Sequence, residues 1–180
     1  MLYKTHLTTS SAIAIPILAA TNELSIVTFS GVALGSLLPD IDTPNSFIGK
    51  RLKIISRPIN SFFGHRGVIH SITPVVILLM LSFILKSSFL WVITFGFLLH
   101  LIEDTFSEKG IKWFAPFSEL NIRIPFEILR YKTGGLKEYV ILGIALTSLY
   151  FQLRNGQYMS EGINQFSSLI TNTITSLIHI

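Results

Sequence analysis

Two apolar runs separated by a short polar break fill the stretch VIHSITPVVILLMLSFILKSSFLWVITFGFLLHLIED (residues 68–104). The first run extends from Val68 to Leu85 and the second from Phe89 to Ile102, with the break at residues 86–88. A helix needs roughly 20 apolar residues to cross a bilayer, and each run approaches that length. The stretch therefore predicts two membrane helices joined as a hairpin.

The composition of the whole chain agrees with a membrane protein. Of its 180 residues, 49% are hydrophobic and 13% are charged, and the mean hydropathy is +0.59. An ordinary soluble domain is far less apolar. The chain has no cysteine, which excludes disulfides and thiolate zinc sites. The net charge is +4, but no long Lys/Arg run or nucleic-acid motif occurs, so we expect no nucleic-acid partner.

Three further apolar segments extend the predicted bundle. Leu7–Ala20 and Leu24–Leu38 form a second hairpin around a polar turn, and Tyr139–Leu153 is a fifth segment. From Ile163 onward, apolar residues recur at helical spacing opposite Asn, Gln, Ser and Thr, which predicts an amphipathic helix. The alternative of a cleaved secretory signal at the start is disfavoured, because Pro16 breaks the apolar region and a second apolar helix follows.

We therefore predict an all-α fold, a polytopic membrane helical bundle of about five transmembrane helices with a C-terminal amphipathic helix. We predict a single domain over residues 1–180. Its motif-bearing part covers residues 1–137, and the fifth helix and the amphipathic tail cover residues 138–180.

The distribution of basic residues predicts the orientation. With the N-terminus in the cytoplasm, twelve of the fourteen Lys and Arg residues fall on the cytoplasmic side, in residue 4, residues 50–66 and residues 109–137. Only Lys86 and Arg154 fall outside. Because short cytoplasmic loops carry an excess of Lys and Arg, this arrangement is the expected one.

The same topology brings ionisable residues from four helix ends to one membrane depth, on the cytoplasmic side. His100 and Asp104 are four residues apart, so both side chains can point at one centre from the same helix face. The predicted metal ligands are His6, Asp40, Asp42, His65, His70, His100 and Asp104.

Each of these residues also has an ordinary structural interpretation. A single His at a helix end is more often a satisfied polar residue, and Asp next to a proline is commonly a turn residue. Ionisable groups near lipid are costly, however, and usually mark a functional site. Taken together, the seven residues favour a metal site. Glu103 adjoins this face as a candidate base or supporting residue, and His179 is not expected to take part.

The segment HRGVIHS (residues 65–71) suggests how two histidines could approach the site. Residues five apart on a straight helix point about 140° away from each other, so we expect Gly67 to provide a bend between His65 and His70. Seven nitrogen and oxygen ligands exceed the needs of one tetrahedral zinc, which favours two divalent ions about 3.5–4 Å apart. Zinc fits this ligand set best, and manganese or iron also fit.

Hydrolysis is the chemistry that such a site supports, because metals activate a bound water and stabilise the attacking and leaving oxygens. Arg66 is placed to bind a phosphate group bidentately, although it could equally be a charge that only sets topology. The predicted catalytic residues are Asp42, Arg66 and Glu103.

Three motifs in order also carry a resemblance to a known family. With His6 at the head of the first helix, GSLLPDIDTPNS (residues 35–46), HRGVIHS and HLIEDTFSEKGIKWFAPF (residues 100–117) resemble the YdjM family of bacterial inner-membrane proteins. The family is described as membrane-bound metal-dependent hydrolases. The resemblance covers about the first two thirds of the chain and implies the metal ligands named above. It also implies a more distant similarity to zinc-dependent phospholipase C. Ser107 stands where threonine is expected in much of the family.

The predicted function is thus a membrane-embedded metal-dependent hydrolase of phosphoester bonds in a lipid or lipid-linked substrate, with membrane lipids as partners. The predicted location is the bacterial inner membrane, with the metal site on the cytoplasmic side. Two alternatives stay open: a metal or ion transporter, which should carry polar groups at mid-membrane, and a membrane regulator with a closed structural metal site.

Overall fold

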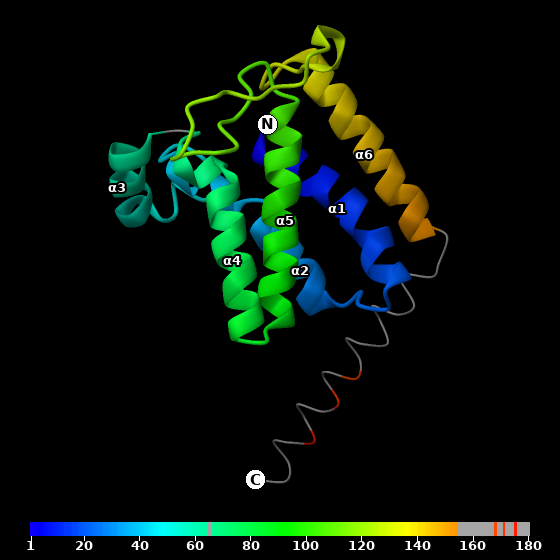
Figure 1. Cartoon of the computed structure of the whole chain (residues 1–180). Helices are drawn as coiled ribbons and strands as arrows, with labels where there is room; N and C mark the ends of the chain where they lie inside the picture. The colour runs from blue at the N-terminus through cyan, green and yellow to red at the C-terminus, as the bar shows by residue number, and fades with distance from the viewer. Residues whose placement is uncertain (65, 155–167, 169–170, 172–174, 176–180) are drawn as a thin grey trace.

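The computed structural model describes residues 1–64 and 66–154, together with residues 168, 171 and 175. Helices α1, α2, α4, α5 and α6 form a bundle, and the short helix α3 stands beside it (Figure 1). The helical elements in chain order are α1 (Tyr3–Ala20), α2 (Ile26–Gly35), η1 (Leu38–Asp42), α3 (Lys53–Phe63), η2 (Val68–His70), α4 (Ile72–Ile84), α5 (Ser88–Thr105), η3 (Glu127–Leu129) and α6 (Leu136–Arg154). No strand occurs in the described part of the chain, so the predicted all-α class is confirmed. The predicted amphipathic helix after Ile163 falls largely outside the described residues.

The hairpin of residues 68–104 is present as α4 and α5, which pack against each other. Helix α4 begins at Ile72 because residues 68–70 form the separate turn η2 and Ser71 caps the helix, accepting a hydrogen bond from the Thr73 backbone. Ser87 caps α5 in the same way, accepting from the Leu90 backbone. These caps satisfy backbone N–H groups that have no partner within the helix. Two serines therefore set the starts of the hairpin helices.

The other predicted apolar segments correspond to α1, α2 and α6. A capping box between Ser25 and Thr28 starts α2 after the turn that follows α1. Helix α6 packs along α1. At its start the buried Glu138 side chain accepts hydrogen bonds from the backbone of Leu2 and of Gly134. This carboxylate holds the beginnings of α1 and α6 together.

Helices α2 and α5 are in backbone contact. A Cβ atom at Gly35 would lie 2.1 Å from the Ile93 carbonyl oxygen, and one at Gly96 would lie 2.2 Å from that of Val32. Both distances are far below van der Waals contact, so only glycine fits at either position. Around this contact a small core forms from Ala14, Leu18, Val32, Val92 and Leu99. The close contact brings the C-terminal end of α2 against the last turns of α5.

Helix α3 was not predicted. It packs mainly against η1 and stands apart from the bundle (Figure 1). Its apolar residues do recur at helical spacing, but Pro58 lies within it and basic residues interrupt the segment. A periodicity search that tolerated both features would have found it.

Among the described residues, α5 is the one helix that is both long and apolar enough to cross a membrane. Helices α2 and α4 are apolar but shorter. The five membrane spans and the cytoplasmic orientation of the N-terminus therefore stay predictions.

Candidate metal centre

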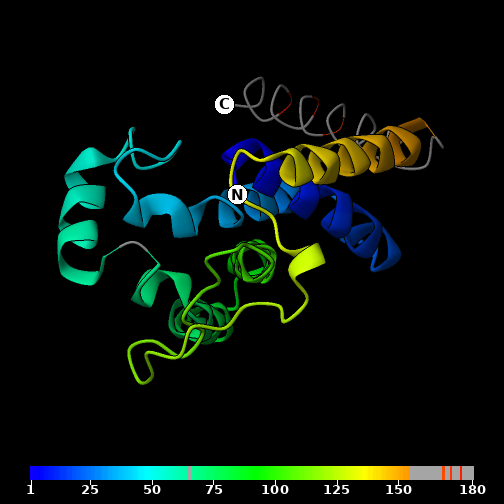
Figure 2. The same ribbon diagram turned by 90° about the horizontal axis from the view of Figure 1, so that it is seen from above.

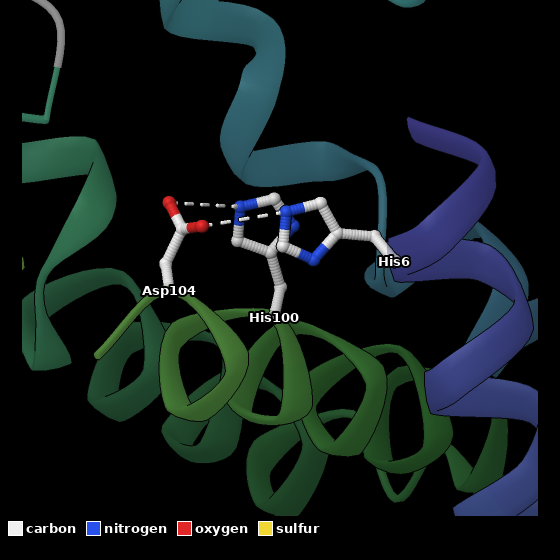
Figure 3. A group of neighbouring side chains, drawn as sticks. All are labelled: His6, His100 and Asp104. Atoms are coloured by element: carbon white, nitrogen blue, oxygen red, sulfur yellow. Dashed lines mark ion pairs between the residues drawn. The ribbon is translucent and has the colours of Figure 1, made fainter. Parts of the chain in front are cut away.

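The last turns of α5 carry the first residues of the site. His100 and Asp104 lie one turn apart and are both buried. Their side chains point to the same side of the helix, with His100 Nε2 4.0 Å from Asp104 Oδ2 (Figure 3). The structure thus brings these two side chains together, and their role as metal ligands stays a prediction.

His6 reaches this centre from α1. Its ring stacks on that of His100, with the centroids 3.7 Å apart and the planes 14° from parallel (Figure 3). The Nδ1 atom lies 2.5 Å from Glu103 Oε2. The buried Nε2 atom has no hydrogen-bond partner, and Asp104 Oδ1 lies 3.5 Å from it. One ring nitrogen is therefore held in place, and the other faces the centre.

Glu103 owes its position to α1. Thr9 Oγ1 donates a hydrogen bond to Glu103 Oε1 at 2.7 Å, and Ser10 Oγ donates to the same oxygen at 2.9 Å. His6 occupies the other carboxylate oxygen. Because Thr9 and Ser10 follow His6 by three and four residues, all three lie on one face of α1. Glu103 thus orients His6, the role that a carboxylate typically plays behind a metal-binding imidazole.

His70 enters from η2 with the same arrangement. Its Nδ1 atom lies 2.7 Å from Asp42 Oδ2, which also accepts a hydrogen bond from the Arg66 backbone. The Thr43 hydroxyl donates to Asp42 Oδ1. The His70 Nε2 atom faces the centre, 3.9 Å from both Asp40 Oδ1 and Asp104 Oδ2.

His100 completes the pattern. Its Nδ1 atom lies 2.7 Å from the Ser36 carbonyl oxygen at the C-terminal end of α2. A carbonyl oxygen can only accept, so Nδ1 carries the proton. In all three histidines an acceptor lies behind Nδ1 and Nε2 points inward, which is the usual way that proteins present imidazole to a metal.

The His70 and His100 Nε2 atoms are only 3.3 Å apart. When both Nδ1 atoms carry protons, the two neutral rings direct lone pairs at each other. Such a contact requires either a proton or a cation between the nitrogens. The donor set therefore fits a metal ion.

Asp104 is held by three groups from other parts of the chain. Its Oδ2 atom lies 2.7 Å from Arg66 Nη2, and its Oδ1 atom lies 3.0 Å from the Met1 amino nitrogen. The buried Tyr131 hydroxyl donates to Asp104 Oδ1 at 3.2 Å and to the Glu103 carbonyl oxygen at 3.0 Å. Burial and the nearby Asp104 charge raise the pKa of Tyr131 well above its usual range. Tyr131 therefore acts as a fixed donor.

Arg66 is already engaged within the protein. Besides Asp104, its guanidinium donates to Ser107 Oγ at 2.7 Å and to the Gly110 carbonyl oxygen at 2.9 Å. Its backbone has a φ of 60°, so the chain turns at Arg66. Gly67, at φ −85°, is instead required for space, because a Cβ there would lie 2.0 Å from the Phe63 carbonyl oxygen. The predicted bend is thus one residue earlier than expected, and the predicted phosphate-binding role of Arg66 stays a prediction.

Two overlapping groups of side chains could hold metal ions in the described part of the chain. One consists of His6, His100 and Asp104, and the other of Asp40, His70 and His100, with the ligand atoms of each group within 4.8 Å of one another. The structure thus brings together five of the seven predicted ligands. Asp42 lies behind His70, and His65 is outside the described residues. Because the groups share His100, the number of ions stays a prediction.

A cavity of about 600 Å³ opens beside this centre. Asp40, Arg66 and Asp104 line it on the side of the site, and Lys50, Arg51 and Lys109 add positive charge. The arrangement suits a small anionic group placed next to the metal ligands.

Four residues that contribute to the site were not predicted from the sequence: Thr9, Ser10, Ser36 and Tyr131. The Ser36 carbonyl cannot be recognised from sequence, because a backbone acceptor carries no side-chain signal. Tyr131 lies in a segment without apolar periodicity. Thr9 and Ser10 did leave a signal, since polar residues three and four positions after His6 share its helix face.

The fold and site together define a class: an apolar helical bundle with a buried cluster of imidazoles and carboxylates at one end. Over residues 1–170 the sequence matches the family described as "YdjM inner membrane protein", and the chain belongs to that family. It is 34% identical over 143 residues to "Inner membrane protein YdjM" of Escherichia coli (strain K12), covering 75% of this chain and 70% of that protein. It is also 34% identical over 122 residues to "Uncharacterized protein YvsG" of Bacillus subtilis (strain 168), covering 66% and 74%. No solved structure matches. The family prediction is confirmed.

Proposed function

We propose that this protein is a metal-dependent hydrolase of the bacterial inner membrane that cleaves phosphoester bonds in a lipid or lipid-linked substrate at the cytoplasmic face. The relatives named as inner membrane proteins support the location. The excess of Lys and Arg on one side of the predicted spans supports the orientation.

The observation that carries the proposal is the pair of Nε2 atoms on His70 and His100, 3.3 Å apart and each on a ring whose Nδ1 is held from behind. Buried imidazoles in this arrangement need a cation or a proton between them. His6, with its unpartnered buried Nε2 atom, points to the same place.

The residues that would hold a divalent metal are His6, Asp40, His70, His100 and Asp104. A bound zinc ion, or a pair of ions, lowers the pKa of a coordinated water and stabilises negative charge on oxygen. Asp42 and Glu103 would keep His70 and His6 in the metal-binding tautomer, as residues behind metal ligands do. Both are buried against hydrogen-bond donors of the protein.

The cavity beside the ligands supports a phosphoester substrate. Lys50, Arg51 and Lys109 attract an anion into it, and Arg66 lines it together with its ion-pair partner Asp104. For Arg66 to contact a phosphate, its guanidinium would have to share hydrogen-bonding capacity with Asp104, Ser107 and Gly110. A guanidinium has five N–H donors, and its Nε atom is buried without a partner here.

The position of the cluster favours hydrolysis over transport. The ionisable groups gather at one end of α5, whereas a transport path would place some of them in the middle of the helices. In the middle of α5, Thr94 bonds its own helix through the Leu90 carbonyl oxygen.

The proposal is tested by turnover of lipid phosphoesters. Full-length protein, loaded with zinc or manganese in lipid discs, is incubated with phospholipids and with lipid-linked phosphates, and the released product is measured. We expect hydrolysis by the wild type and none by His100→Ala. His179→Ala is the matched histidine control and should retain full activity. If the wild type and His100→Ala release product equally, the proposal is wrong.

A further inference from the structure

Helix α3 presents an apolar stripe that the described residues leave uncovered. Ile54 is 91% exposed and Phe62 is 82% exposed. With Pro58 between them, they are spaced by four residues and so lie along one side of the helix. Ile55 and Phe63, each about half exposed, widen the stripe. Exposed apolar patches of this kind mark interaction surfaces.

The opposite side of α3 is fixed to the protein. Ser56 is fully buried there, and Asn60 Nδ2 donates a hydrogen bond to the Asp42 carbonyl oxygen at 2.7 Å. Asp42 is the residue that orients His70. The exposed stripe therefore belongs to a helix that is anchored directly behind the candidate metal centre.

Basic residues accompany the stripe. Lys50, Arg51, Lys53 and Arg57 occur between Thr43 and Gly64, and this segment contains no acidic residue. On a helical projection Arg57 lies about 100° from Pro58 and Lys53 about 100° from Ile54, so both flank the stripe rather than share its face. An apolar face with basic residues beside it is the pattern of a helix that lies in an anionic membrane surface.

The direction of α3 agrees with this role. Seen from above, α4 and α5 appear end-on, whereas α3 is seen along its length at the side of the bundle (Figure 2). It lies toward the end of the bundle where α5 finishes (Figure 1). A helix across the bundle axis at this level can lie in the plane of the lipid headgroups.

We propose that α3 is an interfacial helix that docks on an anionic lipid surface, with Ile54 and Phe62 inserted at the boundary between headgroups and acyl chains. The basic residues then meet anionic headgroups. Because Lys50 and Arg51 also line the cavity beside the metal centre, the docked helix places the cavity mouth at the level of the headgroups. This inference does not depend on the hydrolase proposal.

A second copy of the chain is a less suitable occupant. In a symmetric dimer through α3 the same surface meets itself, so the basic residues beside one stripe would approach those of the other. Basic residues brought close together in this way would repel each other. An anionic lipid surface satisfies both the apolar stripe and the charge.

The test measures the depth of α3 in lipid discs. Because the chain contains no cysteine, Ile54→Cys and Phe62→Cys can be labelled singly with a small fluorophore in the full-length protein, without removing other thiols. Arg57→Cys, on the polar side of the same helix, is the matched control. Discs of phosphatidylcholine with phosphatidylglycerol are compared with discs of phosphatidylcholine alone, using brominated acyl chains as the lipid quencher and iodide as the aqueous quencher.

We expect the labels at positions 54 and 62 to be quenched several-fold more by brominated lipid than the label at position 57, and more strongly in discs with phosphatidylglycerol. Iodide should quench mainly the label at position 57. The inference is overturned if iodide quenches positions 54 and 62 as strongly as position 57. It is also overturned if protection from iodide disappears on dilution to one protein per disc, which would identify a second copy as the occupant.

Discussion

The two halves of helix α5 have different roles, one in helix packing and the other in the candidate metal centre. Before His100, Val92 and Leu99 pack in an apolar core, and Gly96 lets α2 approach until the backbones touch. From His100 to Asp104, the same helix carries three buried ionisable side chains. The first half determines how closely the helices pack, and the second half presents chemistry.

Packing in the apolar half of α5 positions a hydrogen-bond acceptor for His100 in the polar half. Because α2 lies against α5 at Gly35 and Gly96, its last turn places the Ser36 carbonyl 2.7 Å from His100 Nδ1. A wider helix spacing would remove that acceptor. The imidazole would then lose the hydrogen bond that directs Nε2 inward. The orientation of His100 therefore depends on the close packing of α2 against α5.

Removing a ligand from the polar half should have the largest effect. We expect His100→Ala to weaken zinc binding by more than about 100-fold, above the range of residues behind the ligands. His100 belongs to both candidate ligand groups, so its loss disrupts both. Competition with a chelator measures the affinity, and His179→Ala serves as the control. An unchanged affinity would contradict the role assigned to this end of α5.

Changing a residue behind a ligand should have a smaller effect. Glu103→Gln keeps the shape but weakens the hydrogen bond to His6 Nδ1, so we expect zinc affinity to fall by about 10–100-fold. Glu127→Gln, at an exposed glutamate, is the control and should bind zinc like the wild type. If the two variants bind equally well, Glu103 has only a packing role.

The apolar half can be tested through its glycine. In Gly96→Ala the added methyl group meets the Val32 carbonyl oxygen and the Ser36 nitrogen, so α2 must move. We expect a loss of about 1–3 kcal/mol in the free energy of unfolding, the usual cost of overpacking. Zinc affinity should also fall, because Ser36 shifts with α2.

Gly143→Ala in α6 is the matched control, because a Cβ there meets open space. Alanine is the better helix former by about 1 kcal/mol, so this variant should be as stable as the wild type or more so. Chemical denaturation in detergent measures both variants. Equal free energies of unfolding for Gly96→Ala and Gly143→Ala would show that the α2–α5 contact can accommodate a methyl group.

The cavity charges should have the smallest effect. Lys50→Gln removes one exposed charge near the predicted substrate site. Exposed charge interactions are worth about 0.2–1 kcal/mol. We therefore expect KM for an anionic substrate to rise a few-fold with little change in kcat. The difference should shrink at high salt, and Lys86→Gln at the opposite end of the hairpin should leave KM unchanged.

Much of the fold could be predicted from the apolar runs. The hairpin of α4 and α5 is continuous in sequence, and its break at residues 86–88 is polar. Helix α3 escaped prediction because Pro58 and the basic residues mask an amphipathic period. The contact at Gly35 and Gly96 also escaped, since a glycine in an apolar run does not reveal which helix lies against it.

The sequence could predict which residues form the candidate site, but not which partner each residue contacts. His100 and Asp104 share a helix face by their spacing alone, and the other ligands follow from their positions at helix ends. That Asp42 and Asp104 face different partners depends on the turn at Arg66, which no spacing rule specifies. The backbone acceptor for His100 depends on helix packing across 64 residues of sequence.

The central claim is that the inward-facing imidazoles hold a metal ion. The most direct measurement is the metal content of purified full-length protein by mass spectrometry, together with X-ray absorption at the edge of the metal found. We expect at least one tightly held divalent ion per chain, with imidazole nitrogen scattering at about 2.0–2.1 Å if the metal is zinc. A protein that keeps no metal after exposure to zinc, manganese and iron, or whose metal shows no imidazole ligation, would contradict the claim.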